Sequence, residues 1–223
     1  MEPANVGNVP GHQRVLATSD RHVPFAIQST HLLRHYLQHD RETVAHSWRV
    51  SILATRLAQH LNGTEEEIAI VRLAALLHDI GKAWIPAPIL HKPTKLNAEE
   101  YRLMQEHPVH SHDLLRSYAP ATAYWQHISK IVLHHHEHWD GNGYPSQLAG
   151  ANIPYEARIC AVADVWDALI SARSYRPAWE PSAVAAHLRA EAGRSLDPQM
   201  VEVFLAMQGY PLLSWKFQDA PKP

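Results

Sequence analysis

Cysteine is almost missing from this chain, since Cys160 is the only one among 223 residues. A single thiol excludes a disulfide framework and a zinc site built from several thiolates, and the cytoplasm becomes the expected compartment. Long apolar runs are missing too, because Arg72 interrupts the longest stretch, at about 68–77. Nothing approaches the roughly 18 uninterrupted apolar residues of a membrane span. Residues 1–15 lack the basic start and apolar core of a secretory signal, so we expect a soluble globular protein without membrane insertion.

An excess of charge of one sign is also missing. Lysine and arginine number 20 against 22 aspartates and glutamates, which gives a formal net charge of −2. No overall basic field would attract nucleic acid, so no nucleic-acid partner is expected. Histidine, in contrast, is abundant at 18 residues. Because histidine is the commonest metal ligand and titrates near neutral pH, this surplus indicates metal binding or acid–base chemistry, although some histidines fit ordinary surface positions.

The apolar pattern is helical through most of the chain, and no stretch alternates as a strand does. Thr64 and Glu67 have the spacing of a capping box. The helix that they open is apolar almost all round through Leu77, so it should be central and buried. We therefore predict an all-α helical bundle with its functional residues at helix ends and in loops. Other expected elements are a helix at about 97–107 that ends before Pro108, helices at about 121–139, 154–171, 181–192 and 198–207, and loops at 86–93 and 140–153.

Candidate metal ligands lie on or near these helices. His78 and Asp79 close the buried helix, and adjacent helical side chains point about 100° apart. They would reach two neighbouring metal positions if Asp79 bridges, or they would be a helix-terminal aspartate beside a capped histidine. Glu42 and His46 lie four residues apart on one helical face, which suits either shared ligation or an exposed pair. Asp164 lies in an apolar helix and needs a partner, for which a metal is one candidate. For Asp167, one turn on, an arginine partner is favoured.

His107, His135 and His136 add three more imidazoles. A set of imidazoles and carboxylates without thiolates suits iron, manganese or zinc in five- or six-coordination better than structural zinc. Seven or eight ligands are too many for one ion, so the sequence predicts a cluster. Metals roughly 3.5–4 Å apart can share a hydroxide and clamp a phosphoryl group during in-line displacement.

The sequence resembles the HD-GYP domain, a branch of the HD phosphohydrolase superfamily. The resemblance implies a helical bundle of the HD type around a metal cluster, over residues 25–208, with tails at 1–24 and 209–223. It rests on stretches that follow the family order: DRETVAHSWRV (40–50), LAALLHDIGK (73–82), IPAPILHKPTKL (85–96), His107-Pro108, HHEHWDGNGYP (135–145), IPYEARICAVADVWDAL (153–169) and SARSYRPAW (171–179).

The resemblance also implies an activity, namely metal-dependent hydrolysis of the bacterial second messenger cyclic di-GMP to pGpG and, in some members, GMP. Two or three divalent ions are implied, with iron or manganese expected, and a metal-bridging hydroxide would attack phosphorus. Asp79 and Lys82 would be catalytic, with Lys82 beside the scissile phosphate, and Tyr144, Arg173 and Arg176 would contact the nucleotide. The implied metal ligands are His46, His78, Asp79, His107, His135, His136 and Asp164, with Glu42 for a third ion.

Three positions depart from the family pattern: Thr94 and Ser111 stand where glycine is common, and His138 stands where arginine is common. Within the first 40 residues we expect no sensory or receiver domain, because they are too few for one. Two alternative functions stay open. One is another HD-type nucleotide phosphohydrolase, which needs only the ligands at His46, His78, Asp79 and Asp164. The other is a module that senses cyclic di-GMP or docks a partner such as a GGDEF-type diguanylate cyclase. Homodimer formation also stays open.

Overall fold

The predicted all-α architecture is confirmed. A computed structural model describes residues 41–172 and 177–211, and in these ranges the only β-type pairing is an isolated bridge between Ala192 and Leu196. Two short 3-10 helices are labelled η. The elements are α2 (Arg41–His60), α3 (Glu65–Leu77), η2 (Ile80–Trp84), α4 (Ala87–Leu90), α5 (Ala98–Met104), α6 (His107–Tyr118), α7 (Ala123–Leu133), η3 (Gly150–Asn152), α8 (Tyr155–Ile170), α9 (Pro181–Glu191) and α10 (Pro198–Met207).

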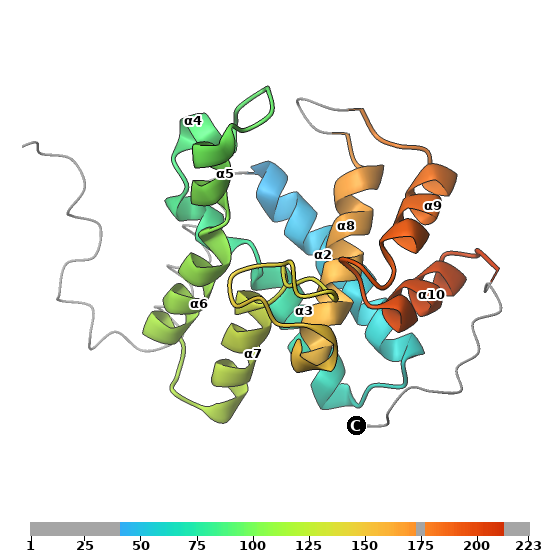
Figure 1. Cartoon of the computed structure of the whole chain (residues 1–223). Helices are drawn as coiled ribbons and strands as arrows, with labels where there is room; N and C mark the ends of the chain where they lie inside the picture. The colour runs from blue at the N-terminus through green and yellow to red at the C-terminus, as the bar shows by residue number, and fades with distance from the viewer. Residues whose placement is uncertain (1–40, 173–176, 212–223) are drawn as a thin grey trace, which may run out of the picture.

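Helices α2, α3 and α8 form the middle of the bundle. Helix α2 packs against α3 and α8, and α3 also packs against α7 and α8. The green helices α4, α5 and α6 lie on one side of this centre, and α9 and α10 lie on the other (Figure 1). Leu57, Ile131, Ile159 and Phe204 are among the largest fully buried side chains. Burying each such side chain contributes roughly 1.5–3 kcal/mol, which is why the helices pack around this core. Among the described residues, no helix is both long and apolar enough to cross a membrane.

Local sequence signals explain where two of the helices begin. The hydroxyl of Thr64 accepts a hydrogen bond from the Glu67 amide, and the Glu67 carboxylate accepts one from the Thr64 amide at 2.7 Å. Asn97 and Glu100 form the same reciprocal arrangement at the start of α5. Both capping boxes satisfy backbone N–H groups that the first helical turn leaves without partners, and the one at Thr64 was predicted from its spacing to Glu67.

The region around Pro108 was predicted incorrectly. Helix α5 ends at Met104, and a separate helix, α6, begins at His107 with Pro108 in its first turn. Proline is well accommodated there because its missing N–H is one that the first turn would leave unpaired. Pro108 therefore starts a helix instead of closing one. The segment 86–93, expected to be a loop, likewise contains the single turn of α4 after Pro86.

The helix that was expected to carry the histidine run is also shorter than predicted. Helix α7 ends at Leu133 instead of near Trp139. The amide of His134 is shared between the carbonyls of Lys130 and Ile131, and the imidazole of His135 occupies the carbonyl of Val132. The bonds to the carbonyls of Ile131 and Val132 take the place of regular i→i−4 bonds from later amides, so the chain leaves the helix just before His135 and His136. The predicted N-terminal tail, residues 25–40 of the predicted domain and residues 212–223 of the predicted C-terminal tail lie outside the described residues.

Candidate functional site

Among the described residues, two groups of three side chains have the geometry of metal-binding sites. The first group is His46, His78 and Asp79, and the second group is His107, His135 and His136. Within each group the candidate ligand atoms lie within 4.8 Å of one another. The residues come from α2, the turn after α3, the start of α6 and the turn after α7. The fold therefore brings together residues that are up to 90 positions apart in the sequence, as 136 − 46 = 90.

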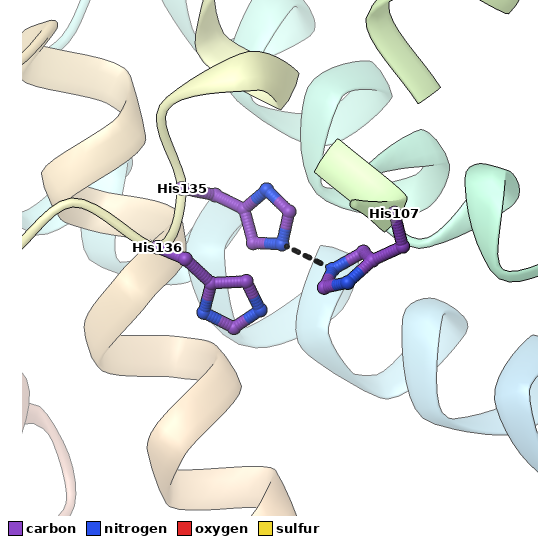
Figure 2. Close-up of side chains that lie close together, drawn as sticks. All are labelled: His107, His135 and His136. Atoms are coloured by element: carbon purple, nitrogen blue, oxygen red, sulfur yellow. Dashed lines mark hydrogen bonds between the residues drawn. The ribbon is translucent and has the colours of Figure 1, made fainter. Parts of the chain in front are cut away.

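Asp79 connects the two groups. Its Oδ2 lies 3.3 Å from Nε2 of His78 and 3.7 Å from Nε2 of His46, while its Oδ1 lies 3.2 Å from Nε2 of His107. Nε2 of His107 lies 3.3 Å from Nε2 of His135, and Figure 2 shows His107 reaching from the start of α6 toward the two histidines of the opposite turn. One carboxylate oxygen thus faces each group, which is the placement that a bridging aspartate requires.

Backbone carbonyls orient three of the imidazoles. The Nδ1 atoms of His78, His107 and His135 lie 2.6–2.8 Å from the carbonyl oxygens of Ala75, Met104 and Val132, three residues earlier in each case. A carbonyl oxygen can only accept, so Nδ1 carries the proton and Nε2 keeps a free lone pair. An imidazole held in this way presents Nε2 to a metal in a fixed direction. Each of these histidines is buried.

Carboxylates orient the imidazole of His46. Its Nδ1 lies 2.7 Å from Oδ2 of Asp167, and its Nε2 lies 2.9 Å from Oδ1 of Asp164. Arg49 donates two hydrogen bonds to Asp167, from Nε at 2.7 Å and from Nη2 at 2.9 Å. The predicted arginine partner of Asp167 is therefore confirmed. The sequence did not indicate that Asp167 also holds His46, because that contact joins α2 to α8.

The protonation pattern follows from these contacts. Burial alone would lower the pKa of His46, but the carboxylates of Asp164 and Asp167 outweigh it and raise the pKa to about 9. Burial, with the nearby His107, lowers the pKa of His136 to about 3. Burial and its histidine neighbours hold the pKa of His135 well below its ordinary value. Burial opposes ionisation of Asp79, yet His78 and Lys82 keep the pKa of this carboxyl well below its usual range.

The donor set fits divalent metal ions. At neutral pH it offers neutral imidazoles at His135 and His136 together with ionised carboxylates at Asp79 and Asp164. Nε2 of His78 and Oδ1 of Asp79 are buried and make no hydrogen bond to any described residue. Burying a polar atom without a partner is costly, and metal coordination would relieve that cost. Nitrogen and oxygen donors without thiolate suit iron, manganese or zinc.

Lys82 lies directly beside this donor set. Its Nζ is 2.6 Å from Oδ2 of Asp79, and its side chain is partly exposed. Burial is the main cause that lowers the pKa of His107 and of His136, and the positive charge of Lys82 lowers both further, so this lysine also influences the second group. A flexible cation at the edge of an anionic centre is suited to meeting a phosphate.

The glycine-rich turn after the histidines is held against the site. The rings of Tyr144 and His136 stack with centroids 5.0 Å apart and an angle of 29°. Buried Glu137 accepts hydrogen bonds from the amides of Ser146 at 2.7 Å and Leu148 at 3.0 Å. A Cβ at Gly143 would overlap the backbone of residues 137 and 138, so only glycine allows this close approach. Glu137 therefore fixes the turn through its backbone amides.

Replacing Glu137 by alanine is expected to lower the free energy of unfolding by about 2–4 kcal/mol, because two backbone N–H groups lose their acceptor. Glu137→Gln keeps one carbonyl oxygen and is the matched variant, for which a smaller loss is expected. Urea unfolding of both proteins in a chelator measures the difference without a contribution from metal binding. Equal stability of Glu137→Ala and the parent chain would contradict this account of the turn.

Two of the predicted metal ligands, Glu42 and Asp164, belong to neither group of three, and two of the predicted nucleotide contacts lie outside the described chain. Glu42 is exposed in the first turn of α2, one turn before His46, and it belongs to neither group. Arg173 and Arg176 lie outside the described residues. Asp164 reaches the first group through His46 and lies 4.0 Å from Nε2 of His78.

Comparison with known proteins identifies the family. The sequence pattern of the HD domain family matches residues 28–200. The chain belongs to the HD domain family. This HD domain is 45% identical over 166 residues to a cyclic di-GMP phosphodiesterase response regulator of Xanthomonas campestris, covering 74% of this chain and 43% of that protein. It is 43% identical over 166 residues to 3′3′-cGAMP-specific phosphodiesterase 2 of Vibrio cholerae, covering 74% of this chain and 31% of that protein.

A solved structure supports the fold of this HD domain. An HDGYP protein of Bdellovibrio bacteriovorus superposes with a TM-score of 0.62 at 21% identity, covering 75% of this chain and 52% of that one. The resemblance to the HD-GYP branch is confirmed by curated relatives named cyclic di-GMP phosphodiesterases, at 38–45% identity. HD phosphohydrolases depend on metals, and this HD domain holds two candidate ligand groups. The chain spans less than half of the length of the two curated relatives described above.

Proposed function

We propose that this HD domain is a metal-dependent phosphodiesterase that hydrolyses cyclic di-GMP to pGpG and, by a second cleavage, to GMP. The observation that carries the proposal is the double ligand group joined by Asp79 in a chain 45% identical to a cyclic di-GMP phosphodiesterase. The alternative function, another HD-type nucleotide phosphohydrolase, would need only His46, His78, Asp79 and Asp164. It would leave the second group, His107, His135 and His136, without a role.

We further propose which residues hold the ions. His46, His78, Asp79 and Asp164 would serve one position and His107, His135 and His136 the other, with Asp79 shared and Glu42 available to a third ion. Iron or manganese fits this donor set, and two or three ions can be accommodated by it. Bound divalent ions would supply a water of lowered pKa as nucleophile and would offset charge on the phosphoryl oxygens.

The chain's own residues complete the proposed chemistry. Asp167 and Arg49 keep Nε2 of His46 directed inward, and the backbone carbonyls do the same for the other imidazoles. The Lys82 ammonium would neutralise charge on the phosphate and on the departing 3′ oxygen. Tyr144, stacked on His136, would offer its ring to guanine, and Arg173 and Arg176 would donate to the phosphates.

Product analysis tests the proposed function. Protein purified without oxygen and loaded with Fe²⁺ or Mn²⁺ is incubated with cyclic di-GMP, and pGpG and GMP are separated by chromatography. Metal content is measured on the same samples, so turnover can be related to the number of bound ions. Bound but uncleaved cyclic di-GMP would favour a sensing module. Cleavage of nucleoside phosphates alone would favour another HD-type phosphohydrolase.

A second substrate has a specific observation in its favour. The relative named 3′3′-cGAMP-specific phosphodiesterase 2 is 43% identical over the same length as the cyclic di-GMP relative. Both nucleotides share the two phosphodiester linkages and differ in one base, so the same metal chemistry would serve either. Competition between equal concentrations of cyclic di-GMP and 3′3′-cGAMP gives the ratio of the two kcat/KM values directly.

Lys82→Met is expected to change metal affinity and turnover in opposite directions. Removing the ammonium 2.6 Å from Asp79 removes a cation that competes for this carboxylate, so metal-free protein should bind Mn²⁺ more tightly. Turnover should fall by about 10²–10³-fold, because one charge-stabilising donor is lost. Chelator competition and steady-state kinetics measure the two effects. Lys130→Met, an exposed lysine on α7, is the control, and weaker metal binding by Lys82→Met would contradict the expectation.

A further inference from the structure

The contact between the turn after α3 and the start of α6 contains a serine that no part of the proposed chemistry uses. Ser111 is fully buried on α6. It follows His107 by four residues, so both side chains lie on the same face of the helix. That face packs against η2, the short helix that follows Asp79. The imidazole of His107 and the hydroxyl of Ser111 therefore both approach the turn that contains Asp79.

The hydroxyl of Ser111 makes two hydrogen bonds to that turn. Its Oγ accepts one from the amide of Gly81 at 2.8 Å and donates one to the carbonyl of His78 at 2.9 Å. These two backbone groups lie on either side of Asp79 in the sequence. A hydroxyl can donate and accept at once, so this single side chain fixes the turn from both directions.

Close backbone packing makes these bonds sensitive to position. A Cβ at Gly81 would overlap the carbonyl oxygen of His107 and the amide nitrogen of Ser111. The turn and α6 therefore touch through backbone atoms, with no flexible side chain between them to absorb a displacement. Any shift between them changes the 3.2 Å separation between Oδ1 of Asp79 and Nε2 of His107. Asp79 belongs to the first ligand group and His107 to the second, so this distance sets the spacing between the two groups.

We propose that Ser111 is a positioning residue that sets the spacing between the two ligand groups and thereby their combined metal affinity. The inference rests on the proposed function only in taking these groups to be the metal ligands. Loss of a group that orients metal ligands typically weakens metal binding by 10–100-fold. Ser111 contacts the backbone beside the ligands instead of their side chains. We therefore expect that losing its hydroxyl weakens metal binding about tenfold, near the lower end of that range.

The test compares Ser111→Ala with Ser51→Ala. Ser51 on α2 is also buried, and its Oγ donates a hydrogen bond to the carbonyl of Arg72 on α3 at 2.8 Å. It therefore joins two helices by the same kind of bond, but it makes no bond to the turn that contains Asp79. Metal-free proteins are titrated with Mn²⁺ against a chelator, and Tm is measured in EDTA. Both variants should lose stability, but only Ser111→Ala should bind Mn²⁺ about tenfold more weakly. Ser111→Thr, which keeps the hydroxyl, should restore the affinity.

Each outcome decides a different point. Parental Mn²⁺ affinity in Ser111→Ala, or an equal loss in Ser51→Ala, overturns the positioning role and leaves the proposed function standing. Weakened Mn²⁺ binding by Ser111→Ala in a protein that cleaves no cyclic dinucleotide supports the positioning role and overturns the activity. A parent chain that takes up no Mn²⁺ overturns both. If Ser111→Ala does not fold, Ser111→Gly serves the same test, because it also removes the hydroxyl and needs no side-chain space.

Discussion

Asp79→Ala is expected to lose metal uptake and phosphodiester hydrolysis together. In the described chain, Asp79 is the one side chain that directs one oxygen to each ligand group. Its Oδ2 lies 3.3 Å from Nε2 of His78, and its Oδ1 lies 3.2 Å from Nε2 of His107. Its removal deletes a charge and the connection between the groups. The loss should exceed the roughly 10–100-fold that follows when a residue supporting metal ligands is removed. Metal analysis and product chromatography on the same sample measure both quantities.

The Asp79 experiment needs a variant that separates charge from shape. Asp79→Asn keeps the side-chain volume and one carbonyl oxygen, and it should still lose most metal because an amide is a much weaker ligand than a carboxylate. Asp113→Ala, which changes an exposed aspartate on α6, is the control for general effects on folding. Full activity and full metal content in Asp79→Ala would refute the proposed site.

Gly81→Ala is expected to have the largest effect on stability. The added Cβ would overlap backbone atoms of His107 and Ser111, which cannot move aside as a flexible side chain would. Overpacking of this kind costs about 3 kcal/mol or more. Urea unfolding in a chelator should show a strongly lowered midpoint, and the protein that remains folded should bind Mn²⁺ weakly because α6 is displaced from the turn.

A second glycine provides the comparison for Gly81→Ala. Gly63, in the turn after α2, would place its Cβ 3.1 Å from the carbonyl oxygen of Ala58, a contact that a small shift can relieve. Gly63→Ala is therefore expected to change the free energy of unfolding by less than about 1 kcal/mol. If the two variants unfold at the same urea concentration, the backbone contact at Gly81 is not as tight as the structure indicates.

Short-range signals in the sequence were sufficient for most helix starts. The capping boxes at Thr64 and Asn97 involve residues three positions apart, so the sequence alone contains all of their partners. The ends of α5 and α7 were predicted less well. Pro108 can close one helix or open the next, because proline disfavours the helical conformation in the residue before it and is also accommodated in the first turn of a helix. Helix α7 ends at Leu133 because the imidazole of His135 binds a backbone carbonyl, a competition that periodicity does not reveal.

The types of residue and their order in the chain are enough to define the chemistry that is available to this protein. One cysteine, 18 histidines and carboxylates within apolar helices define imidazole and carboxylate donors, and the ordered motifs define the HD-GYP branch. The division of these donors into two groups, in contrast, depends on the packing of the helices. Each ligand group is formed by segments far apart in the chain, and Asp79 lies between the two groups. The hydrogen bonds of Asp167 to His46 and of Ser111 to the turn after α3 also join distant segments. Such contacts depend on how helices pack against one another, and packing arises from the whole core instead of from any local stretch.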